Sequence, residues 1–190
     1  MINLGFTLLI LGTIKFGIKP IDQTVYYQSA CESVACVEVM DYYGVDISVD
    51  EFLEKLPTIN EYYDGVYNDY FLGDPKSNNG FICYENPLIS VIDGYCNSRS
   101  LQGEEADTIL SLVGRGYPVV VWITYNFNEP IYKSNYDYIW NSHTVVINGY
   151  DSNTGEIYIA DSIYGEVTTS YERFEYVYDK CGRHALLIYE

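Results

Sequence analysis

Residues 29 to 44 read SACESVACVEVMDYYG, and this stretch decides the fold of the first half of the chain. Its apolar residues recur at helical spacing and form one stripe, made of Ala35, Cys36, Val39, Met40 and Tyr43. Gly44 stands where a left-handed residue commonly ends a helix. The stretch therefore predicts a helix that starts at Cys31 and stops before Gly44.

Further helices are expected on both sides of a loop-rich segment. Ser48 and Glu51 form a capping box for a short helix that Pro57 closes, and residues 104–113 and about 170–180 predict two more helices. Between them, residues 58–95 contain many glycines, prolines and asparagines, so we expect a long irregular segment there. Such a segment in a compact domain is commonly functional.

The apolar pattern changes to a period of two in the second half. Strands are predicted at residues 117–125, 143–150, 156–161 and 184–189. The fold class is therefore α+β, with a helical N-terminal half and an antiparallel sheet in the C-terminal half. No linker or repeat divides the chain, so we expect one domain over residues 19–190.

Composition excludes some classes of partner. Over 190 residues the formal net charge is −17, which disfavours nucleic acids and anionic lipid surfaces. We expect a monomer that acts on a peptide or protein. The 22 tyrosines are too many for a core alone, so some must lie at the surface or line a groove.

Five cysteines occur, with no Cys-x-x-Cys pair, and there are only two histidines. This pattern predicts neither a structural metal site nor a cofactor. Cys83 and Cys96 are a candidate disulfide, and Cys36 is expected in the core. A second reactive pair of Cys181 and His184 is disfavoured, because the residues between them indicate a helix end and a strand start.

The first 18 residues are interpreted separately. Residues 2–14 are apolar like the middle of a secretory signal, but they lack a basic flank and a cleavage site, and they are too short to span a bilayer. They are a signal, a weak anchor or an N-terminal strand, and membrane association is expected only if they anchor the chain. Export would suit the acidity, so an extracytoplasmic location is favoured, with the cytoplasm as the alternative.

A reactive thiol can be assembled from residues that lie far apart in the sequence. Cys31 starts a helix, which lowers a thiol pKa, and His143 at the start of a strand is the better of the two histidines to act as its base. Asp161 ends the next strand and can orient the imidazole. Gln23 can donate a hydrogen bond to an oxyanion together with the Cys31 main-chain N–H.

Several motifs extend this set across residues 19–188: KPIDQ (19–23), SACESVA (29–35), MDYYG (40–44), FLGDP (71–75), GFICY (80–84), GYPVVVW (116–122), SHTVVINGYD (142–151), IADS (159–162) and the terminal segment 174–188. With them the chain resembles the bacterial papain-like cysteine peptidases related to the bacteriocin-processing, double-glycine-leader peptidase domain, in their stand-alone branch. The resemblance implies a papain-like fold with Cys31 as nucleophile, His143 as general base, Asp161 as its orienter and Gln23 as oxyanion donor. Trp122 and Tyr84, within two of the motifs, are assigned to substrate binding.

Two departures from the family pattern bear on these roles. Residues 28–30 are Gln-Ser-Ala where the family usually has a turn such as Pro-Thr-Gly, so Gln28 competes with Gln23 for the oxyanion role. Ser162 follows Asp161 where the family usually has proline. No transporter segment accompanies the domain, so leader-peptide processing is not carried over.

The leading hypothesis is a cysteine peptidase that works through an acyl-enzyme at Cys31, with the Tyr-rich segment 58–95 facing the substrate. The alternatives are a non-catalytic binding or surface module on the same fold, and an acyl transferase on the same triad. A low thiol pKa at Cys31 favours the enzyme over the binding module.

Overall fold

The structure, a computed structural model, describes residues 12–25 and 27–190. Its helices are α1 (Cys31–Tyr42), α2 (Val49–Lys55), α3 (Glu85–Ile92), α4 (Ala106–Gly114) and α5 (Tyr171–Lys180), with short 3-10 turns η1 (Gln23–Val25), η2 (Val66–Asn68) and η3 (Tyr125–Phe127). The strands are β1 (Thr13–Lys15), β2 (Thr58–Ile59), β3 (Phe71–Gly73), β4 (Gly80–Ile82), β5 (Asn97–Ser100), β6 (Val119–Thr124), β7 (Ser142–Asp151), β8 (Glu156–Asp161), β9 (Gly165–Ser170) and β10 (Ala185–Tyr189).

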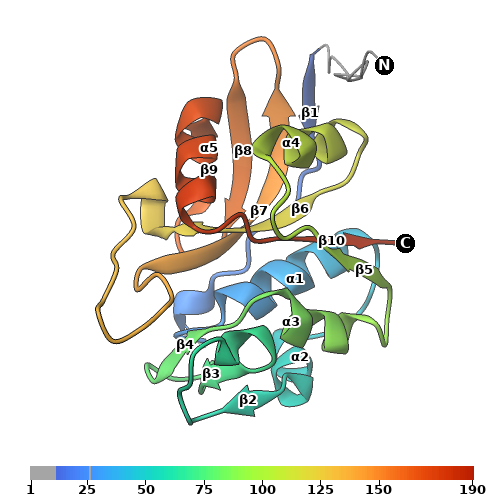
Figure 1. The fold of residues 1–190 in the computed structure, drawn as a ribbon. Helices are drawn as coiled ribbons and strands as arrows, with labels where there is room; N and C mark the ends of the chain where they lie inside the picture. Colours follow the sequence, from blue (N-terminus) through green and yellow to red (C-terminus); the bar gives the residue numbers. More distant parts are fainter. Residues whose placement is uncertain (1–11, 26) are drawn as a thin grey trace, which may run out of the picture.

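One large antiparallel sheet organises the molecule. Its strand order within the described residues is β5-β10-β6-β7-β8-β9, with β1 paired to β7. Figure 1 shows α1, α2 and α3 in one half of the molecule, and the large sheet with α4 and α5 in the other. The α+β class with a Cys31 helix followed by an antiparallel sheet is confirmed.

The centre of the sheet is buried on both faces, which gives three layers. Along β6, Val120 and Trp122 belong to the core shared with α1, α2 and α3. Val119, Val121 and Ile123 point the other way, into the core shared with α4 and α5. Because successive side chains of a strand alternate between faces, a strand with two covered faces must be apolar throughout, as Val119–Ile123 is.

Helix α1 is the central helix of the domain. Every residue from Cys31 to Met40 is buried, including Glu32, Ser33 and Glu38. The single apolar stripe predicted from the sequence is therefore too narrow a description, because the sheet covers one side of α1 while α2 and α3 cover others. The buried carboxyl groups on this helix become important at the site.

The capping box at α2 is confirmed, since the Ser48 hydroxyl accepts a hydrogen bond from the Glu51 main-chain N–H at 3.1 Å. Segment 58–95 is more ordered than expected. It contains α3 and a small sheet of order β2-β3-β4 with its own core around Val66 and Leu72. Helix α3 was missed because Pro87 indicated a break, yet proline is tolerated in the first turn of a helix.

Strand β1 joins the start of the described chain to the sheet. It pairs antiparallel with β7, and its Lys15 lies opposite Gly149. Gly149 has φ of +154°, and a Cβ atom there would lie 2.2 Å from the Ile14 carbonyl oxygen, so only glycine permits this approach. Residues 1–11 lie outside the described residues. In the described part of the chain, no helix is long and apolar enough to cross a membrane.

All five cysteines are free thiols. The candidate disulfide between Cys83 and Cys96 is therefore corrected: Cys83 is fully buried against α1, whereas Cys96 is half-buried after α3.

Candidate active site

Two adjacent strands bring His143 and Asp161 together. His143 is the second residue of β7, and Asp161 is the last residue of β8, which pairs with β7. The His143 Nε2–H donates to Asp161 Oδ1 at 2.9 Å, and the two side chains are only 0% and 2% exposed. The pair predicted from the strand pattern thus forms a buried imidazole–carboxylate dyad.

Asp161 is built to remain ionised despite its burial. Burial by itself would raise its pKa, but the hydrogen bond from His143 and the main-chain N–H groups of Ile163 and Tyr164 hold the pKa below its usual value. Those two N–H groups lie 2.8 and 3.1 Å from Oδ1. A charged acceptor at Nε2 leaves Nδ1 as the nitrogen available for proton transfer, and Nδ1 is buried without a hydrogen-bond partner among the described residues.

Cys31 is the first residue of α1 and is 7% exposed. Burial raises the pKa of its thiol well above the usual value, the Glu32 carboxylate raises it further, and a main-chain hydrogen bond from Thr144 acts in the opposite direction. Thr144 directly follows His143 on β7, so the thiol lies against the strand that carries the histidine. The expectation of a low thiol pKa does not hold for this resting arrangement.

Glu32 is a site residue that the sequence analysis did not single out. It is 2% exposed; its Oε2 accepts a hydrogen bond from the Cys31 thiol at 3.3 Å, and its Oε1 accepts one from the Cys83 main-chain N–H at 3.2 Å. Burial raises the pKa of Glu32 to about 7. The available signal was an acidic residue directly after the candidate nucleophile on an otherwise apolar helix.

A pocket of about 200 Å³ opens beside Cys31 and is lined also by Ser29, Phe81, Tyr125 and Trp140. The ring of Tyr125 stacks on His143 with 4.8 Å between ring centres and 15° between planes. Phe81 and Trp140 are both exposed to solvent, with 6.1 Å between their ring centres. Aromatic side chains therefore form part of the wall of the pocket beside Cys31.

The two glutamines that competed for the oxyanion role lie in different environments. Gln23 is 1% exposed and accepts a hydrogen bond from the Ser162 hydroxyl at 2.5 Å, while its Nε2 donates to the Tyr27 carbonyl at 3.3 Å. Gln28 is exposed and donates to the Thr24 carbonyl at 3.3 Å. Ser162 stands where the family usually has proline, and its hydroxyl thus links Gln23 to the turn that directly follows Asp161.

The two aromatic residues assigned to substrate binding lie elsewhere. Trp122 is fully buried in the core, where its Nε1–H donates to the Cys83 carbonyl at 2.9 Å, so it offers no surface to a substrate. Tyr84 stacks on His184 and lines a second pocket. The alternation of side chains along β6 explains the burial of Trp122, because Val120 and Trp122 face the core shared with α1, α2 and α3. The residues at 12–25 and 27–190 contain no cluster of three or more His, Cys, Asp or Glu able to hold a metal ion.

The family model of the Peptidase_C39 like family matches residues 16–186, which span both strands of the dyad and the Cys31 helix. The chain belongs to this family. A crystal structure from Bacillus anthracis, described provisionally as a C39-like peptidase, is similar to it, with a TM-score of 0.81, 22% identity, and coverage of 94% of this chain and 98% of that one. No curated protein matches the chain.

A second solved structure is a double glycine motif protease from an AMS/PCAT transporter in complex with its leader peptide. Its TM-score is 0.53 at 17% identity, with 90% of this chain and 89% of that one covered. At these identities both likenesses establish the fold. The fold is the α+β papain-like C39 fold, with N-terminal helices that include the Cys31 helix and a C-terminal antiparallel sheet.

Proposed function

We propose that this C39-like protein is a cysteine peptidase in which Cys31 is the nucleophile, His143 the general base, and Asp161 the group that orients His143. Gln23 and the Cys31 main-chain N–H are the proposed oxyanion donors. Peptides or proteins are the proposed substrates, and neither a metal nor a cofactor takes part in the proposed reaction.

The observation that carries the proposal is the buried dyad with its free Nδ1. Asp161 accepts from Nε2, and Nδ1 has no hydrogen-bond partner among the described residues. A fully buried imidazole nitrogen without a partner costs stability, so a structural role alone would favour a satisfied or apolar side chain there. A proton-accepting role toward a thiol on the adjacent element accounts for that cost.

The chemistry would proceed by acyl transfer. His143 Nδ1 takes the proton from Cys31, the sulfur attacks the peptide carbonyl carbon, and the two proposed donors stabilise the negative charge that develops on the carbonyl oxygen. The imidazolium, stabilised by Asp161, then gives its proton to the leaving amine, and a water molecule hydrolyses the thioester. An amine in place of that water would give the acyl-transferase alternative.

The protein's charge bears on the choice of substrate. A net charge of −17 attracts basic peptides and repels acidic ones, with an effect that salt screens. The leader peptide in the similar double glycine motif protease structure is a ligand of that protein and does not identify the substrate of this chain. For this chain the proposed substrate class is a neutral or basic peptide.

The test combines labelling and turnover. Iodoacetamide alkylation is followed by peptide mass spectrometry across pH in the wild type, Cys31→Ala and His143→Ala, and the same proteins are screened against a peptide library. The proposal expects cleavage that disappears in both variants and Cys31 labelling that slows without His143. Cleavage that survives in Cys31→Ala would disprove it.

A binding module is the second candidate, and a specific observation favours it. In the resting structure the Cys31 thiol donates to Glu32, and its pKa is raised rather than lowered. A protein that only binds peptides has no need of a thiolate. Library peptides that bind without being cut, together with an inert Cys31, would select this alternative.

A further inference from the structure

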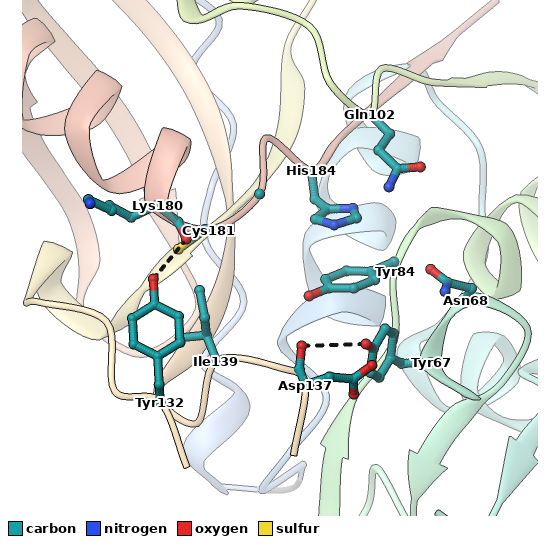
Figure 2. A pocket seen from close by; sticks show the side chains of 11 residues that line it. Tyr67, Asn68, Tyr84, Gln102, Tyr132, Asp137, Ile139, Lys180, Cys181 and His184 are labelled. Carbon is teal, nitrogen blue, oxygen red and sulfur yellow. Dashed lines mark hydrogen bonds between the residues drawn. The ribbon is translucent and has the colours of Figure 1, made fainter. Parts of the chain in front are cut away.

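A second pocket, of about 330 Å³, lies on the other side of one chain segment from the Cys31 pocket. The segment is 137–142, and its residues alternate: Asp137 and Ile139 line the second pocket, whereas Tyr138, Trp140 and Ser142 line the first. The remaining walls come from η2, from the residue just before α3, from the end of α5 and the turn after it, and from Gln102 and Tyr132 (Figure 2). This pocket has no part in the proposed acyl transfer.

His184 is the central polar group of this pocket. It is 6% exposed, and its Nδ1–H donates to both carboxylate oxygens of Glu85 at 3.1 Å. The Ala185 main-chain N–H also donates to Glu85, at 3.1 Å, which fixes the carboxylate in place. With the hydrogen placed on Nδ1, Nε2 can accept a hydrogen bond, and within residues 12–25 and 27–190 it has no hydrogen-bond partner.

The charges around the pocket favour a cation. Glu85 is 3% exposed, and His184 is its ion-pair partner, with 3.1 Å between Nδ1 and Oε1. Asp137 adds a carboxylate whose pKa stays below its usual value: burial would raise it, but hydrogen bonds from Tyr67 and Tyr62 outweigh that effect. Lys180 lines the rim, and Figure 2 shows its side chain directed away from His184 and Asp137.

Aromatic rings supply the remaining walls. Tyr84 lies parallel to His184, with 3.5 Å between ring centres and 4° between planes, and Tyr67 meets Tyr84 edge-on at 4.9 Å. Tyr132 stands at the mouth and is 65% exposed. Burial raises the pKa values of Tyr67 and Tyr84, so these phenols stay neutral. The face of an aromatic ring attracts a cation where no other ring covers it, and His184 covers one face of Tyr84.

We propose that this pocket binds an alkylammonium or guanidinium group, held by the Asp137 carboxylate, the Nε2 acceptor of His184 and the tyrosine rings. Asp137 and His184 both line the cavity, and each has an acceptor atom to which N–H groups of the cation can donate. The group belongs either to a basic side chain of a peptide or to a free amine. The proposal does not rest on catalysis at Cys31.

The test is isothermal titration calorimetry at low salt with matched probes. N-acetyl-arginine amide represents a peptide side chain, agmatine a free amine, N-acetyl-citrulline amide a neutral isostere, and N-acetyl-glycine an anion. We expect at least one of the cations to bind about tenfold or more tightly than the citrulline probe, with affinity that falls as salt is added. Binding of the arginine probe assigns the site to peptides, and binding of agmatine alone assigns it to free amines.

Two variants and one control locate the binding. Asp137→Asn keeps the acceptor for the Tyr62 hydroxyl, which donates to Asp137 at 2.9 Å, but removes the charge, so cation affinity should fall about tenfold. Asp69→Asn removes an exposed carboxylate that does not line the pocket and should leave affinity unchanged. If Asp137→Asn does not fold, Tyr132→Leu provides the second test: it removes an aromatic ring from the same pocket and should also weaken binding of the cation.

Cys31→Ala keeps the site and should bind the cation like the wild type, so loss of peptidase activity and loss of this site are distinguishable. The proposal is overturned if neither cation binds in preference to the citrulline probe, if the acetylglycine anion binds instead, or if Asp69→Asn weakens binding as much as Asp137→Asn does.

Discussion

Replacing Glu32 with glutamine should make the Cys31 thiol more acidic. The two side chains are joined by a hydrogen bond of 3.3 Å from Sγ to Oε2, and both are buried. Two unit charges at that separation repel by about 5 kcal/mol at an effective dielectric constant near 20, and by about 1 kcal/mol in water. At about 1.4 kcal/mol per pKa unit, Glu32→Gln should therefore lower the Cys31 pKa by about one to four units.

The rate effect is smaller than the pKa effect. Each unit by which the Cys31 pKa falls raises the thiolate fraction about tenfold but lowers the nucleophilicity of that thiolate about threefold. Alkylation should therefore accelerate about threefold per pKa unit. Because burial raises the pKa of Glu32 to about 7, its carboxylate is charged mainly above that pH. The acceleration, about threefold to a hundredfold, should appear at pH 8 to 9 and shrink below pH 6.

The assay is iodoacetamide alkylation of Cys31, quantified by peptide mass spectrometry from pH 5 to 9.5. Glu38→Gln is the matched control, because it removes another buried carboxylate of α1 that does not contact the thiol. Equal Cys31 rates in the wild type and Glu32→Gln at pH 9, or equal acceleration by Glu38→Gln, would refute the reasoning.

Three further predictions concern stability and the dyad. Burial raises the pKa of Glu38 to about 8 from 4.5, so the folded state keeps a proton that the unfolded state releases, and the wild type loses stability as pH rises through this window. Glu38→Gln should remove that loss and stabilise the fold at pH 9 by up to about 5 kcal/mol, with little change at pH 4, as measured by urea unfolding. Asp161→Asn removes the anion that orients His143 and should lower kcat/KM on any peptide substrate by about 100-fold or more, with KM little changed, in steady-state assays. Trp122→Phe leaves the buried Cys83 carbonyl without its 2.9 Å donor and should cost about 1–3 kcal/mol in urea unfolding, without changing Cys31 labelling.

The local elements were predictable because their signals are local. The Ser48 capping box, the strand at residues 156–161 and the helix that begins at Cys31 were each predicted close to their observed bounds, since side-chain period and cap chemistry act over a few residues. Helix α3 escaped because a proline in a first turn has the same local appearance as a break.

The pairing of His143 with Asp161 was predicted from strand order, and the observed hydrogen bond agrees. The structure does not support the assignment of Trp122 to substrate binding, because its side chain is fully buried. Whether a strand residue reaches the surface depends on which layers cover the sheet. The sequence alone offered both Gln23 and Gln28 as oxyanion donors. The fold distinguishes them, because it buries Gln23 and leaves Gln28 exposed.

The sequence by itself determined the fold class, the family and the identity of the atoms available for chemistry, since motifs and periodicity are written in the order of residues. Tertiary structure alone decided the electrostatics of those atoms. Glu32 opposes the Cys31 thiolate only because both are withdrawn from water, where a charge interacts far more strongly than at a surface. Likewise, Glu85 and His184 lie 99 residues apart in the sequence, and only the fold places Glu85, the first residue of α3, beside the residue that precedes β10.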